Sequence, residues 1–83
     1  MFIITYADAV SRRISQICGD KHITLNKLAD LSGLRQSTLE NIVKGNTKNP
    51  TLRTLHRIAV GLNMTVSELL DFKIMNESVF EDE

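Results

Sequence analysis

Apolar residues recur at helical spacing along most of the chain, and turn or capping residues interrupt them at short intervals. Thr5 and Asp8 have the spacing of a capping box, whose side-chain oxygens accept hydrogen bonds from backbone N–H groups at a helix start. The first helix is therefore expected to follow Thr5, run to about Cys18 and stop at Gly19. Its apolar face would consist of Val10, Ile14 and Ile17.

Two shorter helices are expected next, on residues 25–31 and 36–44. Thr24 is a suitable N-cap for the first of them, and Gly45 ends the second. The positions expected to be buried on these helices are Leu28 and Leu31, then Leu39 with either Ile42 or Val43. A polar loop follows, in which Pro50 drives the residue before it out of helical conformation.

Thr51 and Thr65 predict two more helix starts, and Glu68 completes a second capping-box pattern with Thr65. The helix after Thr51 would have a stripe of apolar residues: Leu52, Leu55, Ile58, Ala59 and Leu62. The next helix would cover residues 66–70. Only residues 2–5 suggest a strand, and this run is too short to assign. The sequence thus predicts an all-α domain of five short helices within residues 1–72.

Residues 73–83 form an acidic tail with scattered apolar side chains, and three alternatives stay open for it. It is disordered, forms a sixth short helix, or packs against a second subunit of a dimer. The net charge of zero hides a polarised distribution. Residues 1–57 have nine Lys and Arg against four Asp and Glu, and residues 58–83 have one against six. Such asymmetry indicates a basic half that faces nucleic acid.

Composition also limits the chemistry. The chain has one cysteine, Cys18, and two distant histidines, so we expect no disulfide, no metal site and no cofactor. The N-terminal apolar run is too short for a signal peptide or a membrane span, which favours a cytoplasmic protein with no membrane contact. No catalytic residues converge by spacing and no glycine-rich phosphate loop is present, so we expect no enzyme.

Residues 25–44 have the spacing of a helix-turn-helix motif. Ala29 provides the small side chain that a close helix crossing requires, and Gly33 permits a positive φ angle at the turn. From about residue 10 to 70 the chain resembles the lambda-repressor-like (Xre/Cro) family of bacterial and phage DNA-binding domains. The resemblance rests on the segments "LNKLADLSGLRQSTLENIVKG", "KNPTLRTLHRIAVGLNM" and "TVSELL".

This resemblance implies a sequence-specific transcriptional regulator that places the helix over residues 36–44 in the major groove of double-stranded DNA. It implies a homodimer on a palindromic operator, in the cytoplasm of a bacterium or phage-infected cell. The implied base contacts are Arg35, Gln36, Ser37 and Asn41. The implied contacts to the DNA backbone are Thr24, Asn26, Thr38, Lys44, Asn46, Thr47, Lys48 and Asn49. The alternative for these polar side chains is a merely solvated helix face.

Two departures from the family pattern stand out. Leu25 occupies a position where many members have a phosphate-binding glutamine. Cys18 and Val43 stand where many members have a buried Arg–Glu ion pair, and an apolar pair there leaves no stranded charge. We therefore expect Cys18 to be buried against or near Val43. A rival function is an antitoxin-like interaction module, with a protein partner bound through the C-terminal tail.

Overall fold

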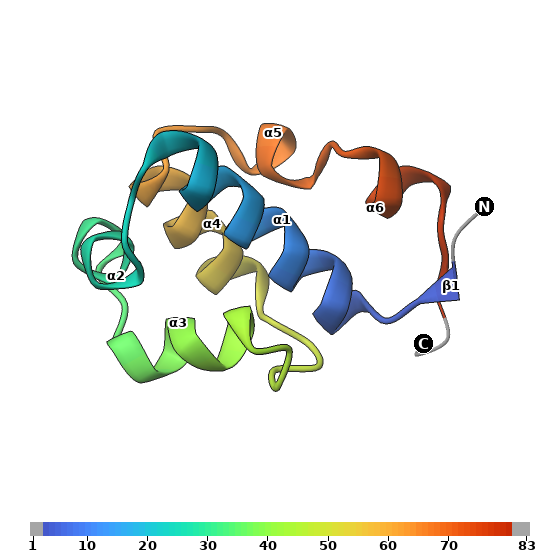
Figure 1. Cartoon of the computed structure of the whole chain (residues 1–83), viewed down its shortest axis with the longest axis horizontal. Helices are drawn as coiled ribbons and strands as arrows, with labels where there is room; N and C mark the ends of the chain where they lie inside the picture. Colours follow the sequence, from blue (N-terminus) through green and yellow to red (C-terminus); the bar gives the residue numbers. More distant parts are fainter. Residues whose placement is uncertain (1–2, 81–83) are drawn as a thin grey trace.

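Six helices and two short strands make up residues 3–80, the part of the chain that the computed structural model describes (Figure 1). The helices are α1 (Tyr6–Lys21), α2 (Leu25–Ser32), α3 (Gln36–Val43), α4 (Leu52–Gly61), α5 (Val66–Leu70) and α6 (Lys73–Glu77). The strands are β1 (Ile3–Ile4) and β2 (Val79–Phe80). The predicted helical fold, with a helix-turn-helix at α2 and α3, is confirmed, and α6 and the strands add to the five expected helices.

Threonines begin four of the helices, as the sequence predicts. Thr5, Thr24, Thr51 and Thr65 each accept a hydrogen bond from the backbone N–H three residues later. At α5 the box is complete, because Glu68 also accepts from the Thr65 N–H at 3.0 Å. This hydrogen bond, strongest for the ionised carboxylate, lowers the pKa of Glu68. These local bonds fix where each helix starts.

The predicted end of the first helix is wrong. α1 continues through Gly19 to Lys21, and His22 takes the left-handed conformation with φ of 55°. The His22 N–H donates to the carbonyls of Cys18 and Gly19. Lys21 Nζ also donates to the Leu62 carbonyl oxygen at 2.8 Å, so the extra turn is tied to the end of α4. This bond joins residues that are far apart in the sequence, so the local sequence does not predict the additional turn.

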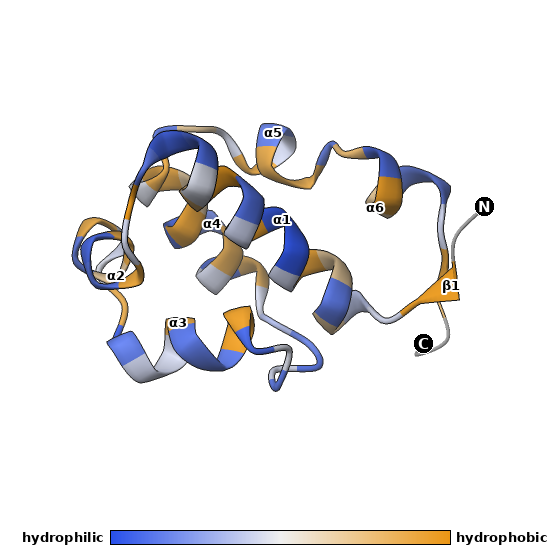
Figure 2. Cartoon of the chain, viewed as in Figure 1, coloured by the Kyte–Doolittle hydropathy of each residue, from blue (hydrophilic) through white to orange (hydrophobic). Residues whose placement is uncertain are grey.

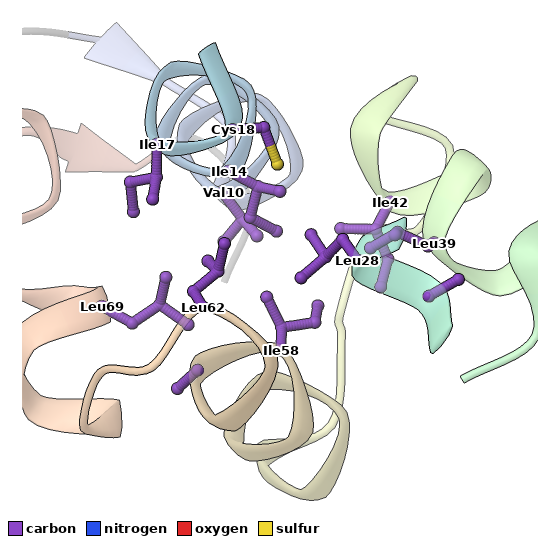
Figure 3. Packing of buried hydrophobic residues seen from close by; sticks show 12 residues of the cluster. Val10, Ile14, Ile17, Cys18, Leu28, Leu39, Ile42, Ile58, Leu62 and Leu69 are labelled. Carbon is purple, nitrogen blue, oxygen red and sulfur yellow. The ribbon is translucent and has the colours of Figure 1, made fainter. Parts of the chain in front are cut away.

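The core lies between α1, α2, α3, α4 and α5 (Figure 3). Ile14, Leu28, Leu39 and Ile58 contribute side chains from four helices, and each has no exposed surface. Two predicted core residues are wrong, since Leu31 is 47% exposed and Leu52 is 69% exposed. The buried face of α2 contains instead the following residues: Leu28, Ala29 and Ser32. With this spacing, Leu31 falls at the edge of the helix face.

The predicted burial of Cys18 is confirmed, since its exposed fraction is 7%. Val43 is partly buried against the same apolar cluster. The Ser11 hydroxyl donates to the Val43 carbonyl oxygen, which joins α1 to the C-terminal end of α3. Burial raises the pKa of the Cys18 thiol because it disfavours the thiolate. Cys18 and Val43 therefore both belong to the apolar packing between α1 and α3.

The two ends of the described chain meet beside the first turn of α1 (Figure 1). β1 and β2 pair in parallel, with Ile3 opposite Val79 and Ile4 opposite Phe80. The Phe80 ring stacks on Tyr6 with ring centroids 3.8 Å apart. Residues 73–80 thus contain a short helix and a strand, whereas residues 81–83 of the acidic tail lie outside the described residues.

Candidate nucleic-acid interface

The turn between α2 and α3 is closed by backbone hydrogen bonds around Gly33. Gly33 has φ of 68°, the left-handed conformation expected from the sequence, and its N–H donates to the carbonyls of Ala29 and Asp30. The Leu34 N–H donates to the Ala29 carbonyl oxygen at 3.0 Å. Leu34 packs partly buried against the core. The turn therefore holds the two helices of the motif at a defined angle.

α3 is anchored on one side and open on the other. Leu39 has no exposed surface and Ile42 only 2%, so both fix the helix against the core. The four predicted base-contact residues are all exposed: Arg35, Gln36, Ser37 and Asn41. Figure 2 shows that α3 is largely hydrophilic apart from a few hydrophobic positions, and that the loop after it is also largely hydrophilic. α3 thus presents a polar outer surface on a rigid support.

Arg35 occupies the N-cap of α3 in extended conformation and makes no side-chain cap hydrogen bond. In this place the unpaired N–H groups of the first turn and the arginine are close together, an arrangement that attracts anions such as phosphate. Thr38 is half-buried on the flank of the helix. Thr38 is therefore less accessible than the four predicted base-contact residues.

Glu40 is a residue of α3 that the sequence did not single out, and it contacts a predicted base-contact residue. It is half-buried, and its Oε1 accepts a hydrogen bond from Gln36 Nε2 at 3.0 Å. The spacing of four residues was the available signal, because side chains at i and i+4 are neighbours on a helix. A carboxylate therefore lies on the polar side of α3, next to a predicted base-reading amide.

The loop between α3 and α4 contains most of the predicted backbone contacts. Lys44 is the C-cap of α3, Gly45 has φ of 77°, and the Asn46 N–H donates to the Asn41 carbonyl oxygen at 2.9 Å. The exposed members of the set are Lys44, Asn46, Lys48 and Asn49, whereas Thr47 is half-buried. This loop follows α3 directly and is largely hydrophilic (Figure 2).

The other two predicted backbone contacts stand at the start of α2. The Thr24 hydroxyl oxygen accepts from the Lys27 N–H at 3.1 Å, and Asn26 is exposed. The neighbouring Leu25 is half-buried and packs against the core. Leu25 therefore contributes packing at the place where many family members have a phosphate-binding glutamine.

The positive charge of Arg13 would suggest a contact with DNA, but its guanidinium is bonded within the protein. Its Nε donates to the Leu69 carbonyl oxygen at 2.9 Å and one terminal nitrogen donates to the Glu68 carbonyl oxygen at 2.8 Å. The guanidinium also lies 5.1 Å from the centroid of the Phe72 ring. These contacts fasten α5 to α1. Arg13 is therefore a structural residue.

Other kinds of site receive no support within residues 3–80. No three His, Cys, Asp or Glu residues in that range are grouped so that they could hold a metal ion. None of the helices there is long and apolar enough to cross a membrane.

Comparisons with known proteins agree with this geometry. The family model described as a Cro/C1-type HTH DNA-binding domain matches residues 13–73. The SPbeta prophage-derived HTH-type transcriptional regulator YopS of Bacillus subtilis is 31% identical over 61 residues, which cover 74% of this chain and 82% of YopS. The transcriptional regulator SinR of B. subtilis is 31% identical over 64 residues, and the match spans 58% of SinR. Both relatives are regulators and not enzymes, as the sequence predicts here.

Solved structures show the same fold. Prophage Lp1 protein 11 superposes with a TM-score of 0.77 and 31% identity, covering 93% of this chain and 99% of that chain. SinR in complex with DNA gives a TM-score of 0.67 at 31% identity, covering 75% of this chain and 98% of that chain. SinR in complex with the SinI protein gives 0.68 at 31% identity, with coverage of 75% and 60%.

Proposed function

Since this chain belongs to the family of Cro/C1-type HTH DNA-binding domains, and is thus a DNA-binding transcriptional regulator, we propose that it reads the major groove with α3. The observation that carries this proposal is the two-sided character of α3. Leu39 and Ile42 hold it in the core, and its polar side chains face outward. The major groove admits an α-helix, and its base edges present a distinct donor and acceptor pattern for each base pair.

Each base-contact residue has a chemistry that suits this role. Gln36 can bind the N6 and N7 edge of adenine, using its carbonyl oxygen and the N–H that is not bonded to Glu40. Arg35 can bind guanine O6 and N7, or a phosphate. Ser37 and Asn41 lie one turn apart on the same side and complete the reading set.

The backbone contacts would fix the protein on the DNA without reading sequence. Lys44 and Lys48 supply positive charge from the loop after α3, together with the amides and hydroxyls of Asn46, Thr47 and Asn49. Thr24, Asn26 and Thr38 supply further uncharged groups. Salt weakens contacts to phosphate. Binding releases cations from the DNA, and the entropy gained by this release becomes smaller as the salt concentration rises.

A second copy of this chain would bind at a groove between α4 and α5. The groove has a volume of about 480 Å³ and is lined by Leu52, His56, Met64, Thr65 and Val66. Leu52 is 69% exposed, and together with Met64 and Val66 it gives the groove a mainly apolar lining. A two-fold dimer uses the same patch on both subunits, and this patch contains no carboxylate or lysine to oppose itself. Such a dimer matches a palindromic operator with half-sites about 34 Å apart.

Selection of bound sequences from random DNA tests the proposal. The expected result is an enriched inverted repeat with half-sites about one helical turn apart, whose binding weakens steeply as salt rises. Absence of an enriched sequence at low salt would contradict the proposal.

The alternative is a protein-interaction role in addition to DNA binding. SinR, a relative of this chain, is solved in complex with the SinI protein. In this chain the exposed Ile3 and Val79 side chains of the paired strands offer an apolar surface to such a partner. A purified chain that binds no DNA at low salt would leave only this role.

A further inference from the structure

We propose that Glu40 is a base-reading residue, which accepts a hydrogen bond from N4 of a cytosine in each half-site while Gln36 stays bonded to it. This inference rests on the proposed function, because it assigns a further specificity residue to α3. It concerns a residue that the resemblance did not point to.

The position of Glu40 on α3 is the first argument. Glu40 follows Gln36 by four residues and Ser37 by three, and it precedes Lys44 by four. Side chains at these spacings are neighbours on one face of an α-helix. Glu40 therefore lies within the proposed DNA-facing surface. Its carboxylate lies between Gln36, a proposed base contact, and Lys44, a proposed phosphate contact.

The second argument is electrostatic. Within residues 3–80, the ion pair within 4.0 Å joins Lys73 to Glu77, so Glu40 has no cation at that distance. An unpaired carboxylate on a surface that approaches phosphates is repelled by them. A compensating donor on the DNA removes this penalty. The exocyclic amino group of cytosine is such a donor, and carboxylates pair with cytosine N4 in the major groove.

The third argument is the hydrogen bond from Gln36 to Glu40. It leaves one oxygen of the carboxylate, Oε2, free of that bond, and it restricts the rotamers of both side chains. A side chain held in its binding conformation loses less entropy when the complex forms. Gln36 and Glu40 would therefore act as one unit on two neighbouring base pairs, with adenine favoured beside Gln36 and cytosine beside Glu40.

The test uses the full chain and the DNA selected by the wild-type protein. Every position of one half-site is replaced by all four base pairs, and the dissociation constant is measured at fixed salt. The wild type should prefer cytosine at one position by on the order of tenfold. Glu40→Gln keeps the size of the side chain and an oxygen for Gln36, but it presents an amide donor to the DNA. It should therefore shift the preference at that single position to guanine or thymine, whose O6 or O4 accepts.

Glu40→Ala should lose the cytosine preference and bind unrelated DNA more tightly, because a negative charge near the phosphates is gone. A Glu40→Gln protein that keeps the wild-type preference at every position would overturn the assignment, since a purely orienting or solvated glutamate predicts that result. Failure of the proposed function looks different, because the wild type itself would then select no sequence. Helical content and melting temperature check that both variants are folded.

Discussion

Gly61, the last residue of α4, packs so closely against α2 that a β-carbon does not fit there without a shift. A Cβ atom built on Gly61 would lie 2.3 Å from Ser32 Oγ, 3.1 Å from Leu28 Cδ1 and 3.1 Å from the Ser32 backbone nitrogen. The contact with the Ser32 hydroxyl is by far the closest of the three, and the contact with the backbone nitrogen adds to it. Gly61→Ala should therefore push α4 away from the first helix of the helix-turn-helix motif.

Two opposing effects set the size of this change. Overpacking of a well-filled core costs about 1–3 kcal/mol. Replacing glycine by alanine in a helix returns about 0.5–1 kcal/mol. From the middle of each range, the net loss should be about 1 kcal/mol, which lowers the melting temperature of a domain this small by roughly 4–8 °C.

Urea unfolding of a double-mutant cycle provides the assay. Ser32 Oγ is buried and has no hydrogen-bond partner among the described residues. Ser32→Ala alone should therefore leave stability unchanged or raise it. The double variant should recover much of the loss, with a coupling energy of at least about 0.5 kcal/mol. A Gly61→Ala protein as stable as the wild type, or a coupling energy of zero, would refute the proposed contact between α2 and α4.

Three further predictions concern other parts of the molecule. Arg13→Ala should lower the free energy of unfolding, measured in urea, by about 1–2 kcal/mol, because its hydrogen bonds to two carbonyl oxygens are lost. Arg13→Lys should not restore the stability, because lysine lacks the planar guanidinium. An unchanged urea midpoint would contradict this. Burial raises the pKa of the Cys18 thiol above its ordinary 9.0, so the folded state holds the proton more tightly and stability should fall as pH rises past about 9. Cys18→Ala should flatten this decline. An equal decline in both proteins would contradict the burial argument. Leu52→Glu should weaken the proposed dimer in sedimentation experiments, whereas Val79→Glu, at an exposed apolar position on β2, should not. The reverse result would place the dimer interface at the strands.

Local chemistry explains why the helix starts were predictable. A threonine that accepts a hydrogen bond from the third residue after it needs no other part of the chain, and all four such starts agree with the structure. The end of α1 also depends on backbone conformation and on a contact with a distant segment. A positive φ angle is uncommon for histidine, and Lys21 reaches the Leu62 carbonyl of a distant segment.

Burial and long-range pairing were harder to predict. Leu31 and Leu52 fit an apolar periodicity, yet the exact crossing of the helices leaves both exposed. β1 and β2 contain two residues each and lie far apart in the sequence, so no local pattern predicts their pairing. The sequence therefore left disorder, a sixth short helix and a subunit contact open for the acidic tail, and residues 73–80 contain a helix and a strand.

The candidate site was largely accessible from sequence. The resemblance placed the reading set on one helix, and the structure leaves Arg35, Gln36, Ser37 and Asn41 exposed there. It did not indicate Glu40, whose relevance depends on the hydrogen bond to Gln36. The structural use of Arg13 was also hidden, because only the packing of α5 brings the Leu69 carbonyl within reach.

The central claim, that α3 reads bases while the following loop binds the DNA backbone, is tested most directly by comparing Gln36→Ala with Lys48→Ala. Binding of both variants is measured on the selected operator and on every single base-pair replacement of one half-site. Gln36→Ala should cost on the order of 1–3 kcal/mol on the operator and abolish discrimination at one position. Lys48→Ala should weaken all sequences equally and reduce the salt dependence of binding. Equal, sequence-independent losses from both variants would contradict the claim.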